Sequence, residues 1–309
     1  MTKNKIERIY IACYKGDFWQ TKICVASIRN WYPEIPIYLI KDVLTGEFNT
    51  KKIEKNFNVS IANFPIKNFG WGISKLEPYF IEEKIRCLIL DSDIVFLGKV
   101  LDYLDKYEED FVVSKQEVKD CNTDWFKRTY YNIVNIQDKI DRTFEYKGYV
   151  FNTGQIVCNT GKYSRSDFEK FIDWKEPPIV KNSEVFSCAD QGILNYYLPT
   201  QENSMKISIG KANFMIWGNS PLVKELDFDI IKNREGYPKL IHWAGGIRDL
   251  KKLNGSDILL YYQKLYYNRI LFGKFKRSLF NLRFAMLGHL KQINRKHNIK
   301  TRLRQKLNF

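Results

Sequence analysis

Histidines and paired cysteines are scarce in this 309-residue chain, which has three histidines and no Cys-x-x-Cys pair among its six cysteines. Scattered cysteines argue against a disulfide framework and against a zinc site, and they indicate reduced thiols. The chain also lacks a run of about 18 apolar residues that could cross a membrane, and the apolar stretch near its start is too short for a signal peptide. We therefore expect a cytoplasmic protein.

Acidic residues are absent after Asp257, whereas 13 of the 50 basic residues follow it, which leaves 37 basic against 35 acidic residues before that point. Apolar residues recur there at helical spacing, and the other positions are rich in Lys and Arg. We expect this segment to form a helix that lies on the inner face of an anionic membrane. The alternative is a helix that packs on the domain. No nucleic-acid partner is expected, because no nucleic-acid motif accompanies the charge. The periodic residues are Leu271, Phe275, Leu279, Leu282, Met286, Leu290 and Ile293.

The composition and pattern that are present indicate a folded α/β protein. Hydrophobic residues make up 44% and aromatic residues 15% of the chain, which excludes a disordered protein. Alternating strand-like and helix-like runs predict a mostly parallel sheet flanked by helices. We expect one domain over residues 1–255 and a basic, amphipathic helical extension over residues 256–309. The strand-like runs are RIYIAC, PIYLIKD, VSIANF, KIRCLILD, DFVVSKQ and YVFNTGQIVCN, and the helix-like runs include TKICVASIRNWY, SKLEPYFIEE, DFEKFIDW and ADQGILNYYL.

Two aspartates, Asp91 and Asp93, directly follow an apolar strand and are separated by Ser92. In an extended segment residues two apart point the same way, so both carboxylates can share one divalent cation. Hard oxygen ligands favour Mg²⁺ or Mn²⁺, which keep open positions for phosphate oxygens, and the small Ser92 leaves room for a ligand. The alternative is a pair of turn and cap residues. Parallel sheets bind ligands beyond the carboxyl ends of their strands, which favours the metal site.

A single histidine, His242, precedes the basic segment, and it too stands at the end of a predicted strand, in KLIHWAGG. A lone histidine is usually an ordinary core or surface residue. A neutral imidazole can nevertheless complete an Asp, Asp, His site for Mn²⁺. We therefore treat His242 as a candidate third ligand.

Polar residues interrupt the apolar strand YVFNTGQIVCN and begin the helical run ADQGILNYYL. Asn152 and Gly154 within a strand indicate either an ordinary bulge or a close approach of the backbone to a ligand. An amide such as that of Asn152 can both donate to and accept from a sugar hydroxyl. Asp190 suits a helix N-cap, and because helix N-termini also suit polar ligands, the two roles can coincide.

Taken in order, SKLEPYFI, CLILDSDIVFLGKV, FNTGQIVCN, ADQGILN and IHWAGG resemble the motifs of GT-A type glycosyltransferases, most closely those of the retaining family numbered eight. That family includes glycogenin and bacterial lipopolysaccharide galactosyl- and glucosyltransferases. The resemblance covers about residues 6–246. It implies a GT-A (Rossmann-like) catalytic domain, a UDP-sugar donor and bound Mn²⁺ (or Mg²⁺).

The resemblance also implies a role for each matching residue. The metal ligands are Asp91, Asp93 and His242. The donor-sugar pocket contains the catalytic candidates Asn152, Asp190 and Gln191, with Gln191 nearest the reacting face. The remaining donor contacts are Ala12, Tyr14 and Asp42 for uridine and ribose, Lys75 for the sugar or ribose, and Ser92, Gly154, Gly245 and Lys251. Because no Pro-Trp pair follows the histidine, the diphosphate lysine could also be Lys252, or Arg248 could replace it.

The resemblance implies a metal-dependent transfer of a hexose from a UDP-sugar to a lipopolysaccharide, capsular glycan or lipid-linked saccharide acceptor, with retention. Two alternatives stay open: an inverting GT-A transferase, and a non-catalytic nucleotide- or carbohydrate-binding protein on the same fold. A sugar nucleotidyltransferase is disfavoured because IACYKGDFWQ is not a Gly-rich phosphate loop. We expect the acceptor-binding loops within residues 121–147.

Overall fold

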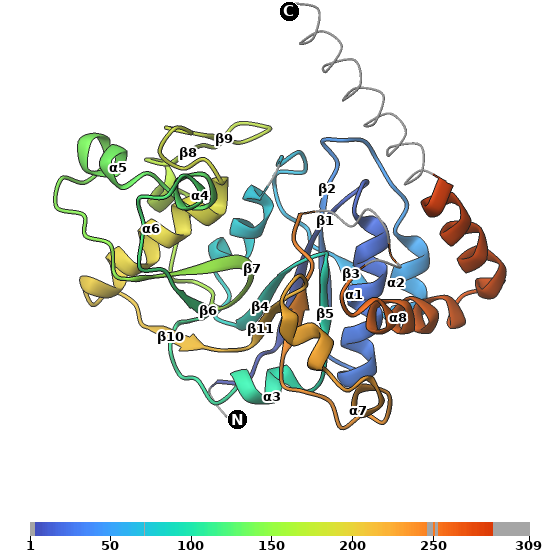
Figure 1. The fold of residues 1–309 in the computed structure, drawn as a ribbon. Helices are drawn as coiled ribbons and strands as arrows, with labels where there is room; N and C mark the ends of the chain where they lie inside the picture. Colours follow the sequence, from blue (N-terminus) through green and yellow to red (C-terminus); the bar gives the residue numbers. More distant parts are fainter. Residues whose placement is uncertain (1–3, 71, 246–249, 251–252, 287–309) are drawn as a thin grey trace, which may run out of the picture.

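The computed structural model describes residues 4–70, 72–245, 250 and 253–286, and its centre is a seven-stranded sheet of order β10-β6-β7-β4-β1-β2-β3 (Figure 1). Strands β1 to β4 are parallel, β10 is parallel to β6, and β7 runs antiparallel to both of its neighbours. The predicted α/β fold with a mostly parallel sheet is confirmed. The strands are β1 (Arg8–Tyr14), β2 (Ile37–Asp42), β3 (Val59–Ile61), β4 (Arg86–Asp91), β6 (Phe111–Glu117), β7 (Tyr149–Asn159) and β10 (Ile209–Ala212).

Helices cover both faces of the sheet, because alternate residues of its central strands are apolar on both sides. On β4, Leu88 and Leu90 face the core that includes α1, α2 and α8, whereas Cys87 and Ile89 face the core that includes η1 and α6. The helices are α1 (Phe18–Trp31), α2 (Lys51–Phe57), α3 (Val100–Leu104), α4 (Asp124–Thr129), α5 (Ile133–Lys139), α6 (Ala189–Asn203), α7 (Phe228–Lys232) and α8 (Ser256–Asn268), and the 3-10 helices are η1 (Ile73–Phe80), η2 (Arg165–Phe168) and η3 (Pro221–Glu225).

A small three-stranded sheet of order β11-β12-β5 continues the chain beyond β4. Strand β5 (Ile94–Phe96) begins just after the two aspartates, and β12 (Leu240–His242) pairs with it antiparallel, so that His242 lies opposite Ile94. Strand β11 (Met215–Trp217) pairs with β12 in parallel. This pairing brings the end of β12 to the turn that follows β4.

The helix predicted for DFEKFIDW is wrong. The segment contains only the end of η2 and then β8 (Ile172–Asp173), which pairs antiparallel with β9 (Ile179–Val180). Its apolar residues have helical spacing, but the carbonyl oxygen of Phe171 accepts a hydrogen bond from the N–H of Lys181 on the neighbouring segment. Tertiary pairing therefore overrides the local periodicity.

The C-terminal part of the described chain packs on α1. The indole Nε1 of Trp31 donates to the hydroxyl of Tyr262 on α8 (2.9 Å), and Phe57 stacks on Tyr266 with ring centroids 4.9 Å apart. Residues 273–286 form a further helix, and the periodic residues Leu290 and Ile293 lie outside the described residues. The division of the chain at residue 255 stays a prediction. Among the helices described, none combines the length and the apolar composition needed to cross a membrane.

Candidate active site

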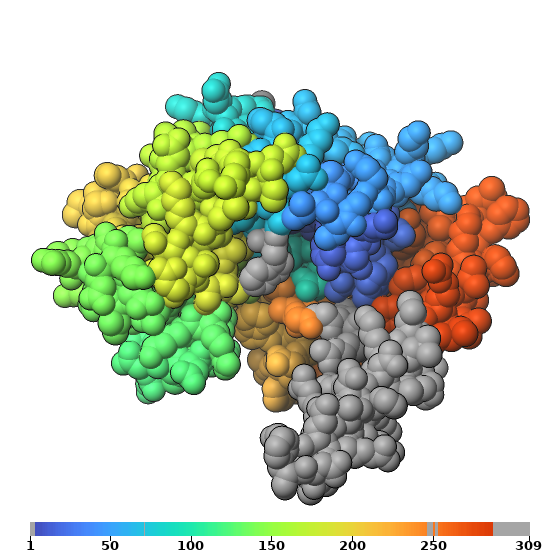
Figure 2. All heavy atoms as spheres, turned by 90° about the horizontal axis from the view of Figure 1, so that it is seen from above, coloured from blue at the N-terminus to red at the C-terminus, as the bar shows by residue number. Residues whose placement is uncertain are grey.

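A cavity of about 700 Å³ opens at the carboxyl ends of β1, β2 and β4, where parallel sheets usually bind their ligands. Figure 2 shows the surface hollowed between the N-terminal part of the chain, in blue to cyan, and the middle part, in green to yellow. Strand β7, the start of α6 and the end of β12 close its other sides. The sequence-predicted residues that line it are Ala12, Tyr14, Asp42, Lys75, Asp91, Ser92, Asp93, Asn152, Asp190, Gln191, His242 and Gly245.

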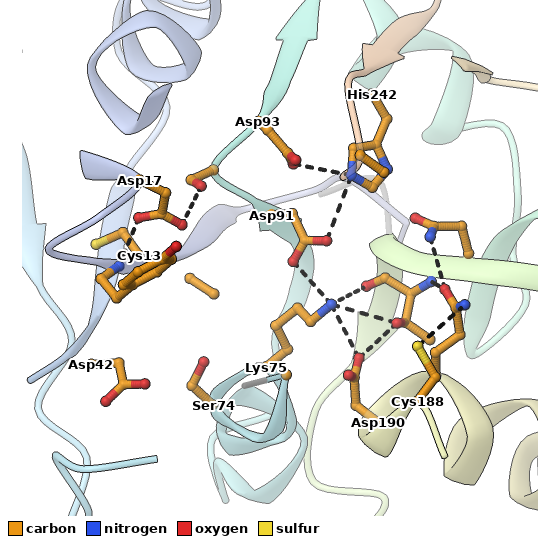
Figure 3. Close-up of a pocket in the computed structure, with 18 of the residues that line it drawn as sticks. Cys13, Asp17, Asp42, Ser74, Lys75, Asp91, Asp93, Cys188, Asp190 and His242 are labelled. Carbon is orange, nitrogen blue, oxygen red and sulfur yellow. Dashed lines mark hydrogen bonds and ion pairs between the residues drawn. The ribbon is translucent and has the colours of Figure 1, made fainter. Parts of the chain in front are cut away.

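The three predicted metal ligands lie together at one end of this cavity (Figure 3). Nε2 of His242 is 3.0 Å from Oδ1 of Asp93 and 3.7 Å from Oδ2 of Asp91. The N–H of Trp243 donates to the carbonyl oxygen of Asp93 (3.1 Å), which ties the end of β12 to the turn after β4. Side chains that are about 150 positions apart in the sequence therefore converge on one point.

The ligand atoms of this cluster and their packing fit a divalent cation. Oδ1 of Asp93 is buried and forms no hydrogen bond, although Nε2 of His242 lies near it. Neighbouring ligands of an octahedral ion with bonds of about 2.1 Å are separated by about 3 Å, which matches the 3.0 Å between Nε2 of His242 and Oδ1 of Asp93. Two carboxylates and one imidazole suit Mn²⁺ or Mg²⁺. Asp91, Asp93 and His242 thus offer three ligand atoms within 4.8 Å of one another, a spacing that one divalent cation could share.

Gly154 leaves the space that these side chains occupy. A Cβ at this position would lie 2.5 Å from Cε1 of His242 and 2.6 Å from Oδ2 of Asp91, closer than real Cβ atoms approach other atoms. The pairing of β6 with β7 also shifts register between Val113 and Lys115, which marks the predicted irregularity in this part of β7. The glycine in the strand therefore accompanies a close approach to the candidate ligands.

Asp93, whose side chain is 17% exposed, and the buried His242 shift each other's pKa. Burial opposes the charge on Asp93, but the His242 imidazole outweighs it and lowers the pKa of Asp93. Burial likewise opposes the charge on His242, yet the carboxylates of Asp93 and Asp91 raise the pKa of the imidazole. Trp217 stacks on the His242 ring with centroids 5.5 Å apart, which fixes the plane of the imidazole.

Lys75 lies buried between two carboxylates. Its Nζ is 2.9 Å from Oδ1 of Asp91 and 3.1 Å from Oδ2 of Asp190, and it donates to the carbonyl oxygen of Thr153 (3.3 Å). Burial opposes its charge, but Asp190 and Asp91 raise the pKa of Lys75, so the side chain stays cationic. Lys75 thereby holds Asp91 through Oδ1 and leaves Oδ2 on the side of His242.

The predicted sugar-pocket residues form a hydrogen-bonded network between β7 and α6. Nδ2 of Asn152 donates to Oε1 of Gln191 (2.8 Å), and Nε2 of Gln191 donates to the carbonyl oxygen of Thr129 (2.9 Å). The hydroxyl of Thr153 donates to Oδ2 of Asp190 (2.6 Å), and burial raises the pKa of that carboxyl. These side chains line the cavity with their positions fixed by one another.

Among the predicted uridine contacts, Ala12 pairs with Asp91 in the sheet, whereas Asp42 lies away from the metal ligands (Figure 3). Asp42, at the end of β2, accepts through Oδ1 from the N–H groups of Leu44 (3.0 Å) and Phe69 (3.1 Å). Tyr14, at the end of β1, is 41% exposed at the cavity rim. The predicted diphosphate contact Lys251, with its alternatives Lys252 and Arg248, lies outside the described residues.

Among the cavity residues that sequence reasoning missed are Asp17, Thr153 and Trp217. Asp17, which precedes α1, lines the cavity and accepts a hydrogen bond from the hydroxyl of Ser92 (2.6 Å). Burial raises the pKa of Asp17 to about 7. An aspartate just after the strand RIYIAC was the available signal, of the same kind that pointed to Asp42.

The chain matches one family model and is similar to many solved structures. The model described as Glycosyl transferase family 8 matches residues 74–248. The structure of the apo WbbM bifunctional glycosyltransferase is similar with a TM-score of 0.55 at 13% identity, over 86% of this chain and 52% of that chain. The glycosyltransferase GlyE of Streptococcus pneumoniae TIGR4 is similar with a TM-score of 0.50 at 14% identity, over 92% of this chain and 64% of that chain. The chain thus spans about half to two thirds of their lengths, and the likeness shows a shared fold. No curated protein sequence matches the chain significantly.

Proposed function

The chain belongs to glycosyl transferase family 8, and from that premise we propose that it transfers a hexose from a UDP-sugar to a lipopolysaccharide, capsular glycan or lipid-linked saccharide acceptor. The observation that carries the proposal is the cluster of Asp91, Asp93 and His242 at the end of the 700 Å³ cavity. A cavity of this size is in the range that holds a nucleotide-sized ligand.

In this proposal Asp91, Asp93 and His242 hold a divalent cation, Mn²⁺ or Mg²⁺. When bound, the cation supplies the positive charge that stabilises a departing nucleoside diphosphate. Lys75 fixes the orientation of Asp91, and Trp217 covers one face of the imidazole ring. The chain's own contribution is thus to hold three ligands in place before the donor arrives.

The side of the cavity formed by the ends of β1 and β2 would bind the nucleoside of the donor. Ala12, Tyr14 and Asp42 stand at the ends of neighbouring parallel strands, where a base and a ribose can lie between the cavity wall and solvent. Asn152, Asp190 and Gln191 line the cavity on the side of β7 and α6, where Asp190 lies beside Lys75 and away from Asp42 (Figure 3), and we assign them to the donor sugar. In oxocarbenium-like chemistry, nearby carboxylate and amide groups stabilise the positive charge of the sugar.

The test of this proposal is a screen of UDP-hexoses for Mn²⁺-dependent release of UDP, with the anomer of the product identified by nuclear magnetic resonance. We expect one donor to be strongly preferred and the product to keep the anomeric configuration of that donor. An inverted product would favour the inverting alternative. Tight UDP binding without turnover of any donor would favour a non-catalytic binding protein.

The helix of residues 273–286 supports a further part of the proposal, that the protein docks on the inner face of an anionic membrane. One side of the helix packs on α1, where Phe280 and Phe284 lie 5.8 and 5.1 Å from Trp19 between ring centroids. Basic side chains such as Lys274 and Arg283 are exposed beside the other side, a pattern typical of interfacial helices. Exposed apolar side chains of this region are Leu271, Phe272, Phe275, Leu279, Leu282 and Met286.

We expect the double substitution Phe275→Glu and Leu282→Glu to abolish sedimentation with vesicles that contain phosphatidylglycerol, because it places two anions in the apolar face. The wild type should sediment with these vesicles and remain in the supernatant with phosphatidylcholine alone. Trp125→Glu is the matched control, since Trp125 is 47% exposed elsewhere on the molecule. Equal sedimentation of the double variant and the wild type would argue against this docking face.

A further inference from the structure

The turn that carries the candidate metal ligands lies just beyond the hydrogen bonds of the main sheet. Strand β4 makes its last ladder pairs at Leu90, opposite Gln155, and at Asp91, opposite Ala12. The next strand starts at Ile94. The conformation of Ser92, between the two aspartates, is therefore not set by pairing within the main sheet.

A single carboxylate, that of Asp17, fixes this turn from the side of α1 (Figure 3). The hydroxyl of Ser92, which is 4% exposed, donates to Oδ2 of Asp17 (2.6 Å). Oδ1 of the same carboxylate accepts from the N–H of Tyr14 at the end of β1 (2.8 Å). The backbone oxygen of Asp17 accepts from the N–H groups of Gln20 and Thr21 in the first turn of α1. The residue thus joins β1, α1 and the turn.

We propose that Asp17 is a positioning residue for the cation site: through Ser92 it holds Asp91 and Asp93 at the spacing that one ion requires. Asp17 lies outside the cluster of Asp91, Asp93 and His242, and both oxygens of its carboxylate accept hydrogen bonds from the protein, so it acts on the ligands through Ser92. Partners that orient metal ligands typically change metal affinity by about 10- to 100-fold when removed. The inference rests on the function proposed above.

The test measures the affinity for Mn²⁺ by electron paramagnetic resonance in the presence of UDP, for the wild type, Asp17→Ala, Ser92→Ala and the double variant. We expect each single variant to bind Mn²⁺ about 10- to 100-fold more weakly. The double variant should be no weaker than Asp17→Ala, because both substitutions remove the same bond. Ser92→Ala leaves the bond from Asp17 to Tyr14 intact, so it tests the proposal even where Asp17→Ala does not fold.

Asp227→Ala is the matched control, because Asp227 also precedes a helix and accepts from a backbone N–H, that of Asp229 (2.8 Å), on α7, and it does not line the cavity. It should lower thermal stability without changing the affinity for Mn²⁺. If the folded Asp17 and Ser92 variants bind Mn²⁺ as the wild type does, the positioning role is wrong while the proposed function stands. A wild type that binds no Mn²⁺ would instead overturn the metal site, and the positioning role with it.

Discussion

Asp93→Asn and His242→Ala should each lower UDP release and sugar transfer at least about 100-fold while leaving the protein folded. Asn keeps the shape of Asp93 but removes the negative charge that faces Nε2 of His242 at 3.0 Å. His242→Ala removes the imidazole that stands opposite both aspartates. Since each residue supplies one of three candidate ligands, either change leaves an incomplete site.

The effect should be specific to the site and not a general loss of stability. Asp173→Asn is a suitable control, because Asp173 is a surface carboxylate that pairs with Lys175 and lies outside the cavity. Far-ultraviolet circular dichroism and the thermal unfolding midpoint identify variants that fold. A folded Asp93→Asn variant with wild-type turnover would mean that this carboxylate does not take part in the reaction.

Gly154→Ala should cause a second large loss, about 10- to 100-fold in turnover, although it adds a single methyl group. The new Cβ would lie 2.5 Å from Cε1 of His242 and 2.6 Å from Oδ2 of Asp91. Neither group can easily move away, because Trp217 stacks on the imidazole and Lys75 holds Asp91. We therefore expect the ligands to be pushed apart and the variant to need more Mn²⁺ for half-maximal rate.

Gly148→Ala separates this steric effect from a loss of stability. Gly148 precedes the same strand, and a Cβ added there would have no atom within 4 Å, but its φ of +77° disfavours any residue with a side chain. We expect this control to unfold at a lower temperature and to keep its turnover. A Gly154→Ala variant with the wild-type Mn²⁺ requirement would show that the strand does not approach the ligands as closely as described.

The sequence predicted those parts of the fold that depend on local pattern. Strand-like apolar runs between helix-like runs indicated β1, β2, β4 and β7. The end of the predicted strand at Asp91 indicated the position of the site. The sequence could not show that the side chain of His242 lies beside that of Asp93, because this depends on the antiparallel pairing of β5 with β12 across more than 140 residues. The resemblance to a family supplied what periodicity could not.

Side-chain roles were harder to predict than positions. The buried place of Lys75 between Asp91 and Asp190 follows from the packing of η1 against β4 and α6, which no spacing in SKLEPYFI reveals. In the sequence Asp17 is an ordinary residue before a helix, and only the structure shows its hydrogen bond with Ser92. In both cases the function of the side chain depends on a partner that is distant in the sequence.

Asp91, Asp93 and His242 are proposed to bind one divalent cation, and a Mn²⁺ titration monitored by electron paramagnetic resonance, with UDP present, examines this binding without relying on turnover. We expect one bound ion per wild-type chain and a large loss of binding in Asp93→Asn and His242→Ala. Full binding by both folded variants, at the wild-type affinity, would contradict it.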